Sequence, residues 1–200
     1  VTILACLAAG RIATLLDDSD PESRVNQIAK LAGVSMMFGG GVEGVGSITS
    51  IPPGYLDTGH EKMWPAPPPI STRQPAFIAP TSGSTGIPKL IVHNQEYVLA
   101  SAFGYMRLLG IDGSDVVAFT GSGGSAAFII NLFISMMSGN MALLVDFRAR
   151  GLNHFIDLMI QYRVTSLRIT PSLARVMSKH PRAHLAFQCV RSLRFIGEPA

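Results

Sequence analysis

Cysteine and charge are both scarce in this chain of 200 residues. Only Cys6 and Cys189 are present, and Asp, Glu, Lys and Arg together make up 14% of the sequence. Two cysteines that far apart exclude a disulfide framework and a CxxC metal site, so we expect a reducing, cytoplasmic compartment. His180 and His184 stand four residues apart, but a proline follows the first and no acidic ligand is near, so we predict no metal site. Low charge with 48% hydrophobic residues also excludes intrinsic disorder, which has the reverse composition.

A strongly basic segment is also missing. The formal net charge is only +3, and eight of the twelve arginines lie between Arg148 and Arg194 without forming a block. They alternate with Leu, Ile and Val, which is typical of the outer faces of helices and strands. Surfaces that bind nucleic acid cluster their positive charge or place aromatic side chains between the charges. We therefore expect no nucleic-acid partner.

One long window, between Asp115 and Asp146, contains no charged residue and is long enough to cross a bilayer. A GSGGS stretch near its start, Asn131, and an SGN stretch near its end interrupt this window. A buried strand, helix and strand explain the window better than a membrane span does. We expect no membrane span.

Strand and helix patterns alternate along the chain except in residues 51–75. Seven of the thirteen prolines fall there, which predicts a connector, because proline lacks an amide donor and restricts the residue before it. We therefore expect an αβ segment in residues 1–50, a Pro-rich connector in residues 51–75 and a second, nucleotide-binding αβ segment in residues 76–200. The alternation predicts an α/β fold with mainly parallel sheets flanked by helices. Within the first segment, Asp20 is expected to cap a helix that begins at Pro21.

The strongest motif is TSGSTGIPK, residues 81–89, between two predicted strands. Gly83 and Gly86 let the backbone turn sharply and approach an anion closely, while the neighbouring hydroxyls can donate hydrogen bonds to phosphate oxygens. Lys89 adds a mobile positive charge. The spacing is not that of a Walker P-loop, because Lys89 falls three residues after Gly86 and no Ser or Thr follows it. The motif predicts a phosphate-binding loop rather than a flexible Ser/Gly linker.

This motif resembles the phosphate loop of adenylate-forming (AMP-binding) enzymes, the superfamily of acyl-CoA synthetases and nonribosomal peptide synthetase adenylation domains. Three other stretches resemble the family in the same order: GRIATLLDDSDPESRV (residues 10–25), RVTSLRITPSLARVM (163–177) and LRFIGEPA (193–200). Residues 146–165, DFRARGLNHFIDLMIQYRVT, look most like the peptide-synthetase type. The resemblance covers only the front of such an enzyme, so we expect an N-terminal fragment that is inactive by itself.

The resemblance implies a carboxylate–AMP ligase that activates a carboxylic or amino acid as an acyl-adenylate. The acyl group would then pass to a phosphopantetheine thiol, on CoA or on an acyl or peptidyl carrier protein. ATP and Mg²⁺ are the implied cofactors, and Lys89 and Thr85 the implied catalytic residues. The implied nucleotide-binding residues are Thr81, Ser82, Gly83, Ser84, Thr85, Gly86 and Lys89 at the phosphates, with Gly197, Glu198 and Pro199 beside the adenine.

Three positions near the implied nucleotide site depart from the family's pattern. Leu90 stands where the family has glycine, and its Cβ makes a positive φ unfavourable. Gln95 stands at the position of the family's histidine, whereas His93 lies two residues earlier, and Ile196 replaces the first glycine of the GGE segment. These departures keep open a degenerate AMP-binding module without catalysis.

A fourth departure concerns the substrate. Ala126 falls where amino-acid-activating members carry the aspartate that pairs with the α-ammonium group, and an unpaired buried ammonium is strongly unfavourable. We place Ala126 and Phe128 in the substrate site and leave open both a plain carboxylic acid and an amino acid held in another way.

A dinucleotide-binding oxidoreductase is the other function that stays open. The GSGGSA stretch from Gly121 to Ala126 follows a predicted strand, and Asp146 comes 25 residues after Gly121. This spacing fits the G-x-G-x-x-A fingerprint of NAD(P)-binding proteins. Any tight turn between a strand and a helix also favours Gly and Ser, so the fingerprint is weak on its own.

Overall fold

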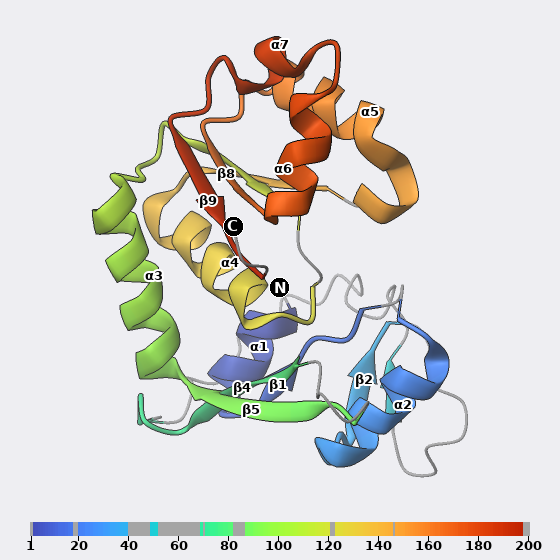
Figure 1. The fold of residues 1–200 in the computed structure, drawn as a ribbon. Coiled ribbons are helices and arrows are strands. Elements are labelled where there is room, and N and C mark those ends of the chain that lie inside the picture. Colours follow the sequence, from blue (N-terminus) through green and yellow to red (C-terminus); the bar gives the residue numbers. More distant parts are fainter. Residues whose placement is uncertain are drawn as a thin grey trace. The chain divides into compact units, whose positions relative to one another are not determined.

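The computed structural model describes residues 2–17, 20–39, 49–51, 69, 71–81, 87–120, 123–145 and 147–197 (Figure 1). Contacts between residues divide the chain into two compact units, and each is described by itself. The first unit comprises residues 1–98 and 123–126, and the second comprises residues 99–122 and 127–200.

The first unit contains two small sheets. Its elements are α1 (Thr2–Ala8), β1 (Ala13–Thr14), α2 (Glu22–Leu31), β2 (Met36–Phe38), β3 (Thr49–Ile51), β4 (Pro75–Thr81) and β5 (Lys89–Asn94). β4 lies between β1, to which it is parallel, and β5, with which it forms an antiparallel hairpin. β2 and β3 form a separate parallel pair. Ala76, Phe77 and Ala79 of the central strand β4 are buried.

The predicted cap of α2 is wrong. Pro21, not Asp20, occupies the N-cap position, and no side chain caps the helix there. The reason is the extended backbone of Pro21, with φ −54° and ψ 139°, which delays the first helical residue to Glu22. Asp20 instead forms an ion pair with Arg24, with 3.5 Å between the nearest nitrogen and oxygen.

α3 (Gln95–Leu109) leads into the second unit, which is built on one parallel sheet. The elements that follow are β6 (Val116–Phe119), α4 (Ala126–Ser138), β7 (Met141–Leu144), α5 (Phe147–Gln161), β8 (Ser166–Ile169), α6 (Pro171–Ser178), α7 (Ala183–Phe187) and β9 (Ser192–Phe195). The strand order is β7-β6-β8-β9, and all three pairs are parallel. α5 is interrupted at Gly151, whose φ of 76° and ψ of 177° are not helical.

Helices α3 and α4 lie on one face of this sheet and α5, α6 and α7 on the other (Figure 1). A hydrophobic cluster packs on each face. Val117 and Phe119 of β6 pack with Ile134 of α4 and with residues of α3; we call this side the α3/α4 face. Ala118 of β6 and Leu167 of β8 pack instead with residues of α5, α6 and α7. Successive strand residues thus point to opposite faces, and both faces are covered, as in doubly wound α/β folds.

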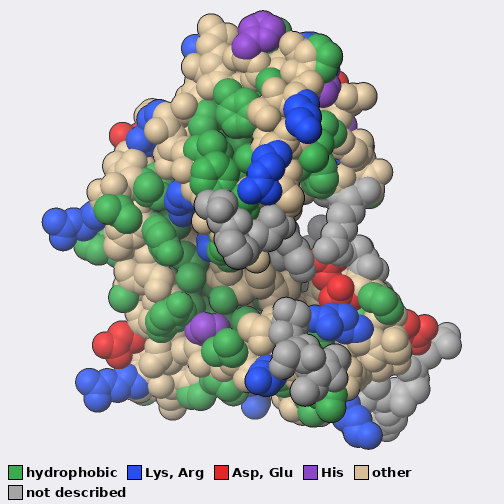
Figure 2. Space-filling view, in the orientation of Figure 1, with side chains coloured by type: hydrophobic (Ala, Val, Ile, Leu, Met, Phe, Trp, Pro, Cys, Tyr) green, Lys and Arg blue, Asp and Glu red, His purple; other side chains and the backbone are tan. Residues whose placement is uncertain are grey.

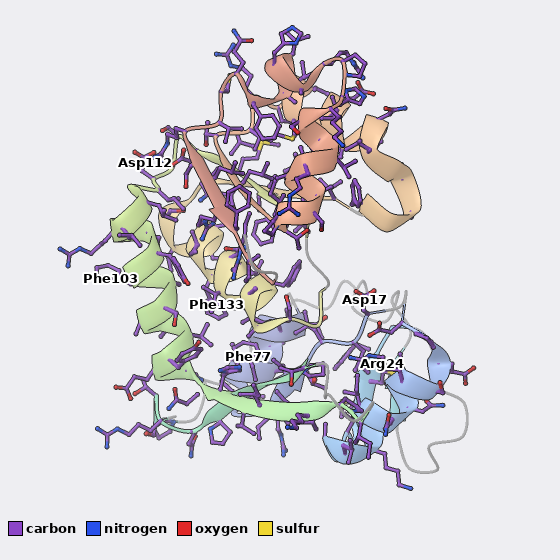
Figure 3. The ribbon with its side chains drawn as sticks, in the orientation of Figure 1. Asp17, Arg24, Phe77, Phe103, Asp112 and Phe133 are labelled. Atoms are coloured by element: carbon purple, nitrogen blue, oxygen red, sulfur yellow. The ribbon has the colours of Figure 1, made fainter. Side chains whose placement is uncertain are left out.

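A buried carboxylate ties the amino ends of the strands together. Asp115, 3% exposed, accepts hydrogen bonds from Thr165 Oγ1 at 2.6 Å and from the amide of Asp112 at 3.0 Å (Asp112 is labelled in Figure 3). The Arg191 guanidinium pairs with both of its oxygens and also donates to the carbonyls of Leu109 and Gly110. The starts of β6, β8 and β9 are therefore joined by one polar network.

The predicted fold class, α/β with parallel sheets flanked by helices, is confirmed. The main departure from a parallel arrangement is the antiparallel hairpin β4–β5. Most of the predicted connector, residues 51–75, lies outside the described residues, and the three-part division of the chain stays a prediction. No helix in the described ranges is both long and apolar enough to cross a membrane. On the face drawn in Figure 2, Lys and Arg side chains are dispersed rather than gathered into one patch.

Candidate functional site

The β4–β5 hairpin fixes both ends of the predicted phosphate loop. Thr81, the last residue of β4, pairs directly with Lys89, the first residue of β5, and Thr81 Oγ1 donates a hydrogen bond to the Lys89 carbonyl at 3.3 Å. Pro88 is buried, whereas the Lys89 side chain is exposed. The hairpin therefore holds the backbone of Lys89 and leaves its ammonium group in solvent. Residues 82–86, which include Thr85, lie outside the described part of the chain.

Leu90 is accommodated without backbone strain. It lies in β5, opposite Pro80 in the antiparallel register. Among the described residues other than glycine, positive φ occurs at Arg163 and not at Leu90. Since a regular strand needs no left-handed conformation, leucine can occupy this position where the family has glycine.

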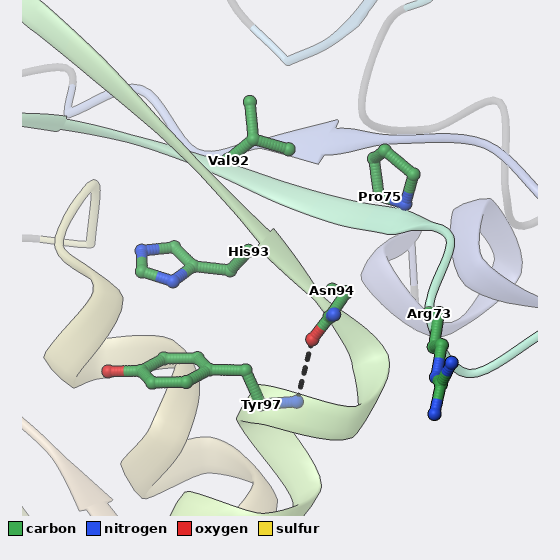
Figure 4. Close-up of a pocket in the computed structure, with 6 residues that line it drawn as sticks. All are labelled: Arg73, Pro75, Val92, His93, Asn94 and Tyr97. Carbon is green, nitrogen blue, oxygen red and sulfur yellow. Dashed lines mark hydrogen bonds between the residues drawn. The ribbon is translucent and has the colours of Figure 1, made fainter.

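A pocket of about 340 Å³ lies beside the end of β5 (Figure 4). His93 stacks on Tyr97 with ring centroids 4.8 Å apart, and Asn94 Oδ1 accepts a hydrogen bond from the Tyr97 amide at 2.8 Å, which caps the start of α3. Burial lowers the pKa of His93, so its imidazole is neutral at pH 7. Arg73 at the rim pairs with Glu96 at 3.6 Å. The pocket contains none of the predicted site residues.

A second candidate region lies at the carboxyl ends of the parallel strands in the second unit. The order β7-β6-β8-β9 places a topological switch point between β6 and β8, because the chain leaves β6 toward β7 and leaves β8 toward β9. Ligands of open α/β sheets bind in the crevice at such a point. Thr120 Oγ1 bridges the two strand ends with a 2.8 Å hydrogen bond to the Arg168 carbonyl. Thr170 caps α6 by accepting a hydrogen bond from the Leu173 amide at 3.2 Å.

The predicted adenine-binding segment begins at the end of β9. Gly197 has a φ of +86°, a conformation that favours glycine, and a Cβ added there would lie 3.8 Å from Cγ2 of Thr170. The amide of Ile196 donates to the Ile169 carbonyl at 3.1 Å, which keeps this segment beside the end of β8. Glu198 and Pro199 lie outside the described residues.

The two predicted substrate residues lie in the first turn of α4. Ala126 is the first residue of this helix. Phe128 is half-buried and packs edge-to-face against Phe119, with ring centroids 5.6 Å apart. This contact places Phe128 beside the carboxyl end of β6, and its role toward a substrate stays a prediction. Gly121 and Asp146 of the dinucleotide fingerprint lie outside the described residues.

Two arginines that the sequence analysis assigned to an outer face lie inside the second unit, and that prediction is wrong for them. Arg168 of β8 and Arg194 of β9 are opposite each other in the parallel register, on the α3/α4 face of the sheet. Arg194 lies over the Tyr105 ring at 5.5 Å, and Arg168 Nη1 donates to the Ala127 carbonyl at 3.4 Å. Both arginines are half-buried, because α3 and α4 cover this face of the sheet. The sequence feature that pointed to this pairing is the triplet Ser-Leu-Arg, which occurs in both strands.

Metal-binding clusters are absent from the part of the chain that the structure describes, since no group of three or more His, Cys, Asp or Glu side chains is arranged to hold an ion. His180 shares a 2.9 Å hydrogen bond between its Nε2 and Asn153 Oδ1.

Solved structures of other proteins share this fold. The N-terminal subdomain of Klebsiella oxytoca NpsA matches with a TM-score of 0.84 and 18% identity, over 98% of this chain and 51% of that chain. O-succinylbenzoate coenzyme A synthetase (MenE) from Bacillus subtilis, in complex with AMP, matches with a TM-score of 0.78 and 17% identity, over 99% and 51% of the two chains. At these identities the matches establish the fold.

Two relatives in sequence are peptide synthetases or synthetase-like enzymes of fungi. The nonribosomal peptide synthetase-like enzyme fsqF of Aspergillus fumigatus is 28% identical over 209 residues, and nonribosomal peptide synthetase ftmPS of Neosartorya fischeri is 28% identical over 187 residues. These alignments cover 99% and 88% of this chain but only 13% and 8% of the relatives. The AMP-binding enzyme family matches residues 1–200, the whole of the chain. The chain therefore belongs to the AMP-binding enzyme family.

Proposed function

We propose that the protein carrying this chain activates a carboxylic acid with ATP and passes the acyl group to a phosphopantetheine thiol, on CoA or on a carrier protein. In the first step a carboxylate oxygen attacks the α-phosphorus of ATP and pyrophosphate leaves. In the second step the thiolate attacks the acyl carbonyl and AMP leaves. The observation that carries this proposal is the family match over the whole chain.

The hairpin β4–β5 supports a phosphate-binding role for the loop between its strands. Reactions of this type are accelerated mainly by positioning the reactants and by neutralising the charge that develops on oxygen atoms. Lys89 is suited to the second task, because its backbone is held in β5 while its side chain is exposed. We assign to Lys89, Thr81 and the intervening residues 82–86, Thr85 included, the binding of the ATP phosphates and of departing pyrophosphate.

The residues at the end of β9 fit a nucleotide base. Gly197 presents no side chain, and its positive φ is compatible with a close approach of a ligand to the backbone. We assign the adenine to Gly197 together with Glu198 and Pro199. Mg²⁺ bound to the ATP phosphates would supply further positive charge at the oxygens of the leaving group.

The start of α4 bears on the kind of acid that is activated. Ala126 has no carboxylate to pair with an α-ammonium group, and burying an unpaired ammonium is unfavourable. We therefore propose an acid whose recognition does not require an α-amino group.

Carboxylate-dependent exchange of pyrophosphate into ATP tests this function. The intact protein should catalyse exchange only when an acid substrate is present, and amino acids should be no better than their deaminated analogues. Exchange with free α-amino acids alone would show that the assignment of Ala126 is wrong. Failure of a broad panel of carboxylic and amino acids to support exchange would contradict the proposed function itself.

A further inference from the structure

We propose that Arg168 and Arg194 bind a second carboxylate on the acid that the enzyme activates, which makes a dicarboxylic acid its substrate class. This inference rests on the function proposed above and adds a specificity determinant to it. Its starting point is a pair of half-buried positive charges in the second unit, beside which the described part of the chain places no negative charge.

The geometry brings the two guanidinium groups to one place. Residues 166–169 of β8 pair in register with residues 192–195 of β9, so Arg168 and Arg194 are direct neighbours. Leu167 and Ile169, the strand neighbours of Arg168, pack into the cluster on the opposite face, which leaves Arg168 on the α3/α4 face. Arg194 is in register with Arg168 and therefore lies on the same face. Contacts with Tyr105 of α3 and with the Ala127 carbonyl of α4 place them between the sheet and these two helices.

The two guanidinium groups have few hydrogen-bond partners among the described residues. Nε, Nη1 and Nη2 of Arg194 are all buried without a hydrogen-bond acceptor among the described residues. Arg168 donates one hydrogen bond, at the long distance of 3.4 Å. Within the described ranges, none of the ion pairs formed by Asp or Glu involves either arginine. Tyr105 offers Arg194 only the face of its ring.

Such an arrangement is unfavourable unless an anion completes it. Arginine keeps its charge in proteins and offers five N–H donors in a planar fork that matches a carboxylate. Burial, followed by the neighbouring charge of Arg168, lowers the pKa of Arg194 to about 10, which leaves it charged at pH 7. Leaving a buried charge without a partner is strongly destabilising, whereas an anion between two guanidinium groups would satisfy both.

The position of the pair favours the acid substrate as the source of this anion. Arg168 contacts Ala127 in the first turn of α4, the turn that also carries the predicted substrate residue Phe128. Each arginine is the second-to-last residue of its strand and so lies near the strand's carboxyl end. Ligands of open α/β sheets bind at the carboxyl ends of the parallel strands. Within the second unit, the start of α4 thus has two cations close by for a carboxylate.

Matched pairs of acids test the inference in the intact protein. The pyrophosphate exchange assay is run with succinate, glutarate, adipate and suberate, each against the monoacid of equal carbon number, and with isophthalate against benzoate. For the best diacid, kcat/KM should exceed that of its monoacid by on the order of 100-fold or more, since a site built for a polar group rejects analogues that lack it.

Arg194→Met is the informative variant. Replacing a buried unpaired charge with an apolar side chain of similar size should leave folding intact or stabilise it, which a thermal unfolding curve checks. The variant should lose the preference for diacids while keeping or gaining activity on monoacids. Arg175→Met, at an exposed position of α6, is the matched control and should change neither the thermal stability nor the preference for diacids. Titration calorimetry of the best diacid without ATP should show binding to the wild type and a loss of at least 10-fold in Arg194→Met.

Three results would overturn the inference while leaving the proposed function standing. The first is exchange that prefers monoacids over their matched diacids. The second is an unchanged preference in Arg194→Met, which would make the arginine a structural partner of Tyr105. The third is Arg194-dependent binding of inorganic phosphate without binding of any diacid. Exchange with none of the acids would instead contradict the proposed function.

Discussion

Asparagine in place of Asp115 should destabilise the protein by about 2–4 kcal/mol. The substitution keeps the shape of the side chain but removes its charge and replaces one acceptor oxygen with a donor. Asp115 is 3% exposed and is the acceptor for Arg191, for Thr165 Oγ1 at 2.6 Å and for the Asp112 amide at 3.0 Å. In the variant, the donors of Arg191, Thr165 and Asp112 therefore face the uncharged amide of the asparagine side chain.

The magnitude follows from which of these interactions are lost. Hydrogen bonds to a charged group contribute about 1.5–3 kcal/mol each, and the bonds from Arg191 and Thr165 belong to this class. Breaking a fully buried ion pair costs about 3–5 kcal/mol, but the Arg191 side chain is 43% exposed and can regain water. It also keeps its hydrogen bonds to the Leu109 and Gly110 carbonyls, at 2.9 and 2.7 Å. The expected loss is therefore below the sum of the lost bonds.

The effect should depend on pH. Burial by itself raises the pKa of Asp115, but hydrogen bonds from Arg191, Thr165 and the Asp112 amide outweigh it and hold the pKa below its ordinary value. On acidification the unfolded state binds the proton first. The stabilisation is complete above the unfolded pKa of about 4 and is lost as the pH falls through that value toward the lower folded pKa. The difference between wild type and variant should narrow below about pH 4.

Urea unfolding, monitored by circular dichroism at pH 7 and at steps down to pH 3, measures the difference in unfolding free energy between the wild type and Asp115→Asn. Asp157→Asn is the matched control, because Asp157 pairs with Arg182 at 2.6 Å while both side chains are about half exposed. It should cost less than about 1 kcal/mol. If Asp115→Asn costs no more than this control at pH 7, the assignment of Asp115 as the link between the strands is refuted.

Two further predictions concern the nucleotide. Leu90→Gly should leave the pyrophosphate exchange rate within about twofold of the wild type, because Leu90 already lies in a regular strand. The same variant should lower the free energy of unfolding by roughly 0.5–1 kcal/mol. If the wild-type protein is inactive and Leu90→Gly with Gln95→His restores activity, the natural sequence is a degenerate AMP-binding module. ATP with Mg²⁺ should raise the thermal unfolding midpoint of the intact protein more than NAD does, since a ligand stabilises the state that binds it. Stabilisation by NAD alone would favour the turn at Gly121 as the nucleotide site.

Much of the fold was predictable because apolar periodicity reports elements reliably. The strand, helix and strand predicted in the uncharged window between Asp115 and Asp146 are β6, α4 and β7. Strand ends were less predictable, because apolar residues continue past the last ladder hydrogen bond. The apolar run that begins at Met141 continues through Val145, whereas β7 ends at Leu144. The prediction that Asp20 caps α2 was wrong, because local sequence preference does not reveal the extended backbone of Pro21.

The candidate site, too, could be predicted only in part. Glycines, hydroxyls and Lys89 carry their chemistry in their spacing, so the loop could be proposed without a structure. The inward arginines could not, because alternation in a strand shows that two faces exist and not which one is covered. Only the register of β8 with β9, together with the packing of Leu167 on the other face, places Arg168 and Arg194 inside.

Acid-dependent pyrophosphate exchange by the Lys89→Ala variant tests the central claim most directly. Loss of one preorganised positive charge should lower the exchange rate by about one to three orders of magnitude. Thermal stability should barely change, because the Lys89 side chain is exposed. Lys179→Ala, at another exposed lysine, is the control and should exchange at the wild-type rate. An active wild-type protein whose exchange is unaffected by Lys89→Ala would contradict the assignment of residues 81–89 as the phosphate loop.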